Sequence, residues 1–343
     1  MDLNQFGLKP LSFSDKPFVD SILTPVETTL SAYSFTAHYI WRDIFQFYQG
    51  IIDGHFCLFA RYGDYIYMPL PPVLVTKGHE NERDKNVPPI VHTYGDTYMD
   101  RRGFLTPPEG FSDEIKISFQ SILSAVFSIM NKINKNPAVS RIGNIDESQK
   151  ETFVSMGYNV SQGESEYVYL RDDLVTLKGN SYKSKRALYN YFVKNYQYSY
   201  EPFQPSYAEE SLKLYDEWRT KRGIKFNDSL YQALLEDSSY SHKQAVNNCE
   251  ALSLTGRVVR INKRVEGYIF GFNRGDISCI LMEITNPDIK GLSQFIFREF
   301  CIEAEGFRFI NTLGDSGLAN LRNAKRSYRP YKTVPAFAAY DKK

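Results

Sequence analysis

Cations crowd a short helix predicted near the end of this sequence. Residues 314–330 open on Gly314 and Asp315, which fit a strand-to-helix turn, and close on Pro330, which cannot continue a helix. After Asp315 no acidic residue occurs before the C-terminal tail, and these cations follow: Arg322, Lys325, Arg326, Arg329 and Lys332. Such a helix can hold an anionic ligand, or it can present a solvated face whose cations the helix dipole favours.

A second cationic helix is predicted over residues 180–196. It carries Lys183, Arg186, Asn190 and Lys194 on one face and apolar or aromatic residues on the other. Tyrosines lie among the cations of both segments, and aromatic rings can stack on the bases of a single-stranded nucleic acid. The two segments therefore predict a groove for tRNA or another phosphate-rich ligand, with two solvated helix faces as the alternative.

Glu283 and the loop after it form the third candidate. Glu283 lies near the end of an apolar strand predicted over residues 277–284, and the loop leads to Lys290 and Gly291 at the start of a helix. A carboxylate in this place can act as a general base if its pKa is raised, whereas a solvent-facing glutamate would do no chemistry. Lys290 and Gly291 could hold a phosphate or form an ordinary N-cap. Because the sequence contains no Gly-x-Gly, we expect weak or no binding of acetyl-CoA.

The composition is that of a soluble globular protein of one or two domains. Of the 343 residues, 42% are hydrophobic and 24% are charged, and the net charge of +1 excludes a globally basic nucleic-acid binder. The cysteines have no paired spacing and the histidines no metal-ligand spacing, so we expect reduced thiols and no metal site. No signal-peptide pattern and no membrane-spanning apolar run occur, which predicts a cytosolic protein without a transmembrane segment.

The element pattern predicts two α+β domains. Helices are expected at residues 34–48, 115–133, 207–222, 229–235 and 291–304, among others. Each half shows the order helix, helix, three antiparallel strands, helix, strand, helix, strand. The predicted domains are residues 1–170 and 171–343. We expect the site in the second domain and a degenerate, structural first domain, which lacks a comparable cluster of cations and carboxylates.

The sequence resembles an uncharacterised bacterial family related to the C-terminal domain of phosphatidylglycerol lysyltransferase. The resemblance rests on four segments, at residues 34–42, 167–179, 183–190 and 315–328. The last is the most specific, and its matching residues are Asp315, Gly317, Leu318, Leu321, Arg322, Ala324, Lys325, Ser327 and Tyr328. Together the segments span nearly the whole chain.

The resemblance implies a fold and an activity. The fold is two tandem Gcn5-related N-acyltransferase-like domains, each a mixed central sheet flanked by helices. The activity is transfer of an aminoacyl group from charged tRNA, or of an acyl group from a thioester, to an amine or hydroxyl acceptor. No cofactor would be tightly bound, and aminoacyl-tRNA or acyl-CoA would be a co-substrate. The lysyltransferases proper carry a multi-span membrane domain with no counterpart in this sequence, and peripheral contact with lipid is left open.

The resemblance also assigns roles to residues. Glu283 would be the general base that deprotonates the acceptor, and backbone N–H groups near the central strand would stabilise the oxyanion. The residues expected to bind substrate are Lys183, Lys185, Arg186, Asn190, Lys290, Gly291, Asn311, Asp315, Arg322, Lys325 and Tyr328. Two alternatives remain: an acyl-CoA-dependent N-acyltransferase, and a non-catalytic protein that binds RNA or a phosphorylated ligand in the same groove.

Overall fold

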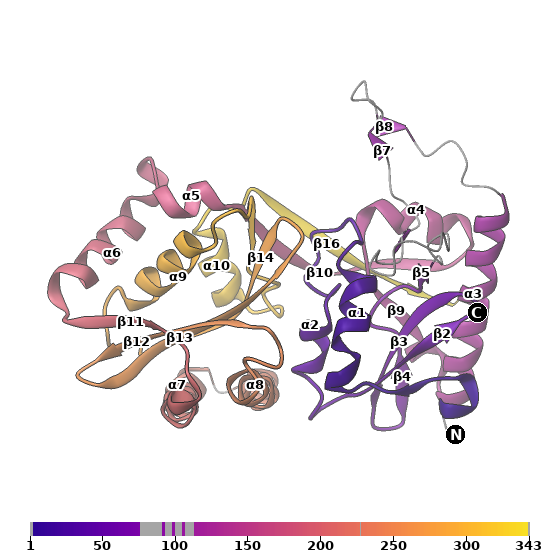
Figure 1. Cartoon of the computed structure of the whole chain (residues 1–343), viewed down its shortest axis with the longest axis horizontal. Helices are drawn as coiled ribbons and strands as arrows, with labels where there is room; N and C mark the ends of the chain where they lie inside the picture. The colour runs from indigo at the N-terminus through magenta and orange to yellow at the C-terminus, as the bar shows by residue number, and fades with distance from the viewer. Residues whose placement is uncertain are drawn as a thin grey trace, which may run out of the picture. The chain divides into compact units, whose positions relative to one another are not determined.

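Contacts divide the chain into two units, and its last strand returns to the first of them. The computed structural model describes residues 3–75, 91–92, 98–99, 105–106, 113–226 and 228–341. The first unit comprises Met1–Ser165 and Val334–Lys343, and the second comprises Glu166–Thr333 (Figure 1). The sequence-based boundary placed residues 334–343 in the second domain, because a terminal strand carries no local signal of the unit that it joins.

In the first unit, an antiparallel sheet is extended by a parallel strand. Its elements are β1 (Lys9–Pro10), α1 (Lys16–Leu23), α2 (Phe35–Tyr39), β2 (Gln46–Ile52), β3 (His55–Tyr62), β4 (Tyr65–Tyr67), β5 (Val73–Val75), β6 (Val91–His92), β7 (Tyr98–Met99), β8 (Leu105–Thr106), α3 (Asp113–Ile133), β9 (Arg141–Ile145), α4 (Glu147–Ser155) and β10 (Asn159–Leu170). The strand order is β1-β2-β3-β5-β6, with β4 paired to β3. Just after β4, Met68 forms a parallel bridge with Ile142 of β9. The returning strand β16 (Lys332–Tyr340) pairs with β9 as well.

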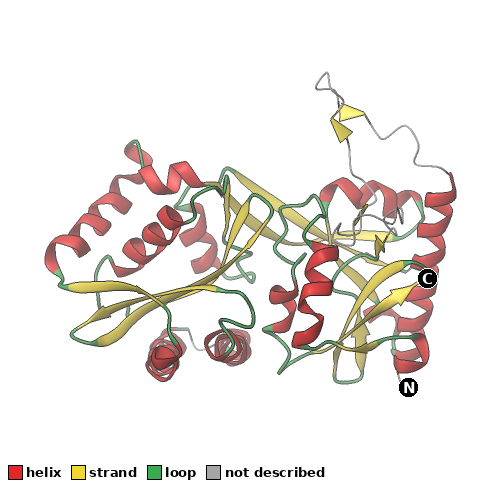
Figure 2. Ribbon diagram, in the orientation of Figure 1, coloured by secondary structure: helices red, strands yellow, loops and turns green. Residues whose placement is uncertain are grey.

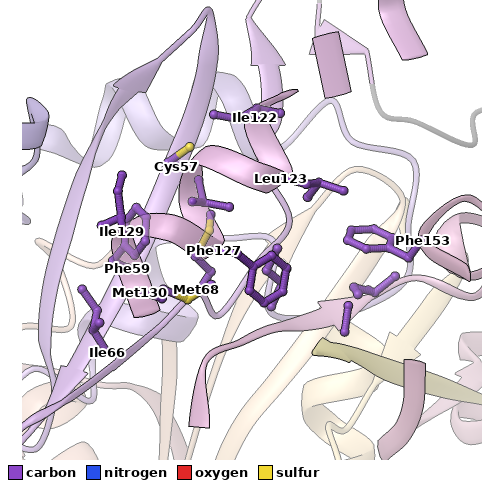
Figure 3. Packing of buried hydrophobic residues seen from close by; sticks show 14 of the residues in the cluster. Cys57, Phe59, Ile66, Met68, Ile122, Leu123, Phe127, Ile129, Met130 and Phe153 are labelled. Carbon is purple, nitrogen blue, oxygen red and sulfur yellow. The ribbon is translucent and has the colours of Figure 1, made fainter. Parts of the chain in front are cut away.

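Apolar side chains of α3 fill the core of the first unit (Figure 3). Ile122, Val126 and Met130 recur at helical spacing and are fully buried. Phe337 and Ala339 of β16 belong to the same apolar cluster. The returning strand is therefore part of this core.

The helix predicted over residues 34–48 is wrong in its second half. Ser34 caps α2 by accepting a hydrogen bond from the backbone N–H of Ala37 at 3.1 Å, but α2 ends at Tyr39. Residues 46–52 instead form β2, an antiparallel partner of β3. The aromatic residues in this stretch fit either period, and pairing with β3 decides between them.

The second unit has helices on both faces of its sheet (Figure 2). Its elements are α5 (Arg171–Thr176), α6 (Lys183–Asn195), β11 (Tyr198–Pro202), α7 (Ala208–Lys225), α8 (Ser229–Asn247), β12 (Thr255–Ile261), β13 (Arg264–Arg274), β14 (Ile277–Thr285), α9 (Leu292–Glu303), β15 (Phe309–Asn311) and α10 (Ala319–Arg326). The strand order is β11-β12-β13-β14-β15-β10. Helices α6, α9 and α10 lie on one face and α7 and α8 on the other (Figure 1). The predicted mixed sheets flanked by helices are thus confirmed.

Helix α8 is much longer than the predicted helix at residues 229–235. It continues to Asn247 through a polar, serine-rich stretch. Only one narrow side of that stretch is buried, at Ser241, His242, Ala245 and Val246. A helix that buries small and polar residues gives little apolar periodicity in the sequence.

Strand β14 separates from β15 after a short parallel pairing. Residues 277–279 of β14 pair with residues 309–311 of β15, whereas pairing of β14 with β13 continues to Thr285. Within the longer pairing, Phe270 faces Met282 and Gly271 faces Ile280, so Leu281 is a bulge residue without a partner. Glu283 therefore lies beyond the point of separation, on the part of β14 that β15 does not cover.

Gly291 lets α9 begin against helix α6. It has φ +86°, and a Cβ atom at this position would lie 2.2 Å from the carbonyl oxygen of Leu188. Only glycine permits both the left-handed backbone and this approach. The residue expected to bind phosphate thus has a packing role between two helices.

We predict that Gly291→Ala lowers the free energy of unfolding by about 2–4 kcal/mol, from overpacking and left-handed strain together. Chemical denaturation monitored by circular dichroism measures the change. Gly275→Ala is the matched control, because Gly275 also has positive φ (+53°) but a Cβ atom there meets nothing within 4 Å. Equal losses in the two variants would contradict the packing role.

Candidate functional site

A partly buried carboxylate lies where β14 meets the start of α9. The hydroxyl of Ser293, in the first turn of α9, donates a hydrogen bond to Oε1 of Glu283 at 2.7 Å. Burial raises the pKa of Glu283 to about 7, although the Ser293 hydroxyl and the charges of Lys325 and Lys185 act in the opposite direction. A carboxylate with this pKa exchanges protons near neutral pH, as a general base must.

Lys185 and Tyr328 lie next to Glu283. The ammonium group of Lys185 is 4.1 Å from the ring centroid of Tyr328. Burial lowers the pKa of Lys185, and the negative charge of Glu283 opposes this shift. Burial and the charge of Glu283 raise the pKa of the Tyr328 hydroxyl well above its usual range, although the Gln294 side chain, which hydrogen-bonds it, counteracts this. Within the described chain, Lys185 has no carboxylate at salt-bridge distance.

The two cationic segments meet at this place. The hydroxyl of Tyr182, just before α6, donates to the carbonyl oxygen of Tyr328 at 3.0 Å, although the two residues are 146 positions apart. Together with the contact between Lys185 and Tyr328, this hydrogen bond joins the start of α6 to the end of the segment 315–328. The predicted approach of the two segments is confirmed.

Asp315 and Arg322 are paired with each other. The carboxylate of Asp315 accepts hydrogen bonds from Nε and Nη2 of Arg322 at 2.9 and 3.2 Å. It also accepts from the hydroxyl of Tyr167 at 2.6 Å and from the backbone N–H of Gly317 at 3.0 Å. The Arg322 side chain, followed by that of Tyr167, lowers the pKa of Asp315 against the effect of burial. Both residues were expected to bind substrate, and the structure places them in an internal ion pair.

Two further cations bind backbone carbonyls. The ammonium group of Lys325 donates to the carbonyl oxygens of Thr312 and Leu313, while its charge still acts on Glu283. The guanidinium of Arg186 donates to the carbonyl oxygens of Leu177 and Gly179. Arg186 thus holds the turn between α5 and α6, whereas Lys325 joins β15 to α10 and contributes to the field at the carboxylate.

The remaining expected residues are exposed to solvent or make structural contacts. Lys183, Asn190 and Lys290 are exposed, and the ammonium group of Lys290 is 4.5 Å from the ring centroid of Tyr191. Asn311 is fully buried; its amide donates to Glu166 at 2.5 Å and its oxygen accepts from Leu313 N–H at 2.7 Å.

Sequence reasoning missed Ser293, Gln294 and Tyr182, which hold Glu283 and Tyr328 in place. Ser293 and Gln294 lie two and three residues after Gly291, in the first turn of the helix after Glu283. Their position in the sequence could have indicated a contact with Glu283, because the first turn of this helix follows the strand that carries the carboxylate. Tyr182 had no comparable signal and was noted only as a tyrosine among cations.

Metal ligation and membrane insertion find no support in the described ranges. No group of three His, Cys, Asp or Glu residues that could hold a metal ion occurs there. Among the helices described, none combines the length and apolar character needed to cross a bilayer.

The chain belongs to the family of phosphatidylglycerol lysyltransferase C-terminal domains, whose profile matches residues 116–340. A conserved protein of unknown function from Bacteroides thetaiotaomicron is similar over 98% of this chain and 100% of its own, with 20% identity and a TM-score of 0.77. The C-terminal domain of a candidate lysylphosphatidylglycerol synthetase from Agrobacterium fabrum has 10% identity over 97% and 93% of the two chains and a TM-score of 0.59.

The L-PGS structure from Bacillus licheniformis is also similar, with 16% identity over 88% of this chain and 85% of that one and a TM-score of 0.54. No curated protein matches the sequence significantly. The family match confirms the predicted resemblance to the C-terminal domain of phosphatidylglycerol lysyltransferase.

We predict that Arg322→Ala destabilises the protein at neutral pH, because it leaves the carboxylate of Asp315 without its cation. The pKa of Asp315 is lowered in the folded state from its ordinary value of 3.8. The ionised pair therefore stabilises above pH ~4, and its contribution is lost as pH falls through the folded pKa. Unfolding curves between pH 3 and pH 7 measure this, with exposed Arg326→Ala as the matched control. A constant difference across that range would contradict the ion-pair origin.

Proposed function

We propose that the second unit is an acyltransferase that moves an aminoacyl group from charged tRNA to an amine or hydroxyl acceptor. One observation carries the proposal: the Glu283 carboxylate, with its pKa raised to about 7, lies on the part of β14 that has separated from β15. The family and the fold support a transferase. The exposed cations and the loop before α9 support an aminoacyl-tRNA donor.

Glu283 can carry the proton from the acceptor to the leaving group, so the reaction needs no other proton donor or acceptor. Glu283 accepts the proton of the acceptor amine or hydroxyl as its nitrogen or oxygen attacks the donor's ester carbonyl. The bond from acceptor to carbonyl carbon forms, the tetrahedral intermediate collapses, and the bond to the ribose oxygen of the tRNA breaks. The proton then passes from Glu283 to that leaving oxygen. Backbone N–H groups near β14 and the ammonium of Lys185 would stabilise the oxyanion.

Exposed cations near the site suit a nucleic-acid donor. Four cations are exposed here: Lys183 at the start of α6, Arg326 at the end of α10, and Arg329 and Lys332 after it. Tyr331 is 56% exposed within the same segment, so its ring can stack on a base of a single-stranded end. Arg322, Lys325 and Arg186 bind groups within the protein. We therefore expect the exposed cations, and not these three, to contact the phosphates.

An acetyl-CoA donor is less well supported. The loop before α9 lacks the glycine pattern that cradles a pyrophosphate, and Gly291 is occupied by its contact with the backbone of Leu188. Acyl-CoA-dependent transfer remains the alternative enzyme. The loop geometry favours a donor held mainly by side-chain cations.

We predict that Glu283→Gln abolishes transfer while the wild-type rate rises with pH through about 7. The sign follows from the raised pKa: below it the carboxylate is protonated and cannot accept a proton, and above it the base is present. The assay follows label from aminoacyl-tRNAs, charged in vitro with a mixture of labelled amino acids, into a total lipid extract or free amines. Ser293→Ala is the companion variant, and it should shift the pH profile to higher pH because it removes a hydrogen bond to the ionised form.

Unchanged turnover in Glu283→Gln would contradict its role as the base. Tight tRNA binding without transfer from any labelled amino acid, in the wild type and the variant alike, would favour the non-catalytic alternative. Micromolar binding of acetyl-CoA by calorimetry, lost in Lys290→Ala, would favour the acyl-CoA enzyme.

We also predict that Lys183→Ala and Arg326→Ala each weaken binding of charged tRNA and reduce the salt dependence of the affinity by about one unit of slope. Fluorescence anisotropy at several salt concentrations measures both quantities. Lys263→Ala is the matched control, because Lys263 is equally exposed but lies in the turn between β12 and β13. A loss shared by the control would indicate non-specific attraction.

A further inference from the structure

Two of the most exposed large apolar side chains lie close together in the sequence, at the tip of one helix pair. Ile224, in the last turn of α7, is 80% exposed, and Leu230, in the first turn of α8, is 66% exposed. Leaving such side chains in water costs free energy that burial against an apolar phase would recover. We call Ile224, Leu230 and the nearby cations the α7–α8 tip.

The tip is held firmly, so the exposure belongs to the fold. The Gln232 amide donates to the carbonyl oxygens of Gly223 at 3.0 Å and Phe226 at 2.9 Å, which joins the two helices across their turn. The rings of Phe226 and Tyr231 lie 5.0 Å apart, and Asp228 caps α8 by accepting from the backbone N–H of Tyr231 at 2.9 Å. Ile224 and Leu230 are thus displayed by a well-connected helix pair.

The α7 side of the tip carries two cations, and the exposed carboxylate of Asp228 lies at the start of α8. Arg222 and Lys225 occupy the last turn of α7, and no carboxylate lies within salt-bridge distance of either in the described chain. Both instead lie near aromatic rings: Arg222 is 5.4 Å from the Trp218 ring and Lys225 is 5.6 Å from the Phe226 ring. Lys221, one turn earlier, is paired with Asp288. The tip therefore combines exposed aliphatic groups with unpaired positive charge.

We propose that the α7–α8 tip binds the surface of an anionic lipid bilayer. Aliphatic side chains that enter the interface, with Lys and Arg beside them to meet negative headgroups, are the combination that such a surface recognises. A nucleic acid would offer phosphates to Arg222 and Lys225 but no apolar phase to Ile224 and Leu230. Helices α7 and α8 lie on the face of the sheet opposite α9, although Lys221 pairs with Asp288 in the loop before α9, and the proposed membrane binding does not depend on the proposed reaction.

The test is flotation of the full chain with vesicles of phosphatidylcholine alone or with a quarter of phosphatidylserine. An anionic lipid other than phosphatidylglycerol separates attraction to the surface from recognition of a headgroup at the transfer site. We expect binding only to the anionic vesicles. It should weaken about fivefold in Lys225→Ala and at least tenfold in the double variant Ile224→Ser, Leu230→Ser. Tyrosines of the site are untouched, so the variants should keep tRNA binding.

The chain offers matched controls. Ile117→Ser removes an apolar side chain that is 67% exposed in the first unit, and Lys213→Ala removes an exposed cation on α7 three turns before the tip. Both should bind vesicles like the wild type, and circular dichroism checks that every variant is folded. Absence of binding to anionic vesicles, or equal binding by the double variant, would overturn the proposal. A change from dimer to monomer in the double variant by light scattering, without a change in vesicle binding, would assign the tip to a second copy of the chain instead.

Discussion

The buried carboxylate of Asp315 is the contact on which the architecture of the site depends. It binds Tyr167 of β10, Gly317 in the turn and Arg322 of α10, so one side chain connects a strand, a loop and a helix. Because α10 leads directly to Tyr328, fixing its first turns also fixes the ring that contacts Lys185. A buried charge without these partners would cost much free energy, so the carboxylate and its partners must be in place together.

The second constraint is the separation of β14 from β15. A parallel pair that ends after three residues leaves the rest of β14 supported by β13 alone, and the bulge at Leu281 turns the strand there. Glu283 follows the bulge, and Ser293 on α9 binds its carboxylate. Backbone topology therefore creates a position where a carboxylate can be desolvated and still reach a reacting group, and the raised pKa of Glu283 is the electrostatic result.

The types of the site residues were visible in the sequence, but their pairings were not. Glu283, Lys185 and Tyr328 could be selected from position and resemblance, and the structure brings them together. A pair between Asp315 and Arg322 or Lys325 was a structural alternative to ligand binding, and the structure shows the pair with Arg322, whereas Lys325 binds the Thr312 carbonyl, which no pattern in the sequence indicates. The same limit explains which helices and strands could be predicted. Strand β2 and the second half of α8 depend on partners distant in the sequence, whereas the strongly periodic α3 and α9 were predicted from the local pattern.

Strand β4 of the first unit and strand β14 of the second differ in how their backbone groups are bonded. In and just after β4, internal partners bind the backbone: Asn134 binds both backbone groups of Ile66 at 2.8 Å, and Met68 N–H donates to the carbonyl oxygen of Arg141 at 2.9 Å. Residues 65–70 also contain no carboxylate. In the second unit, residues 280–284 have no backbone hydrogen bond to β15 in the described chain, and Glu283 lies among them. Residues 65–68 of the first unit thus have hydrogen-bonded backbone groups and include no carboxylate, whereas Glu283 of the second unit lies beyond the pairing of β14 with β15.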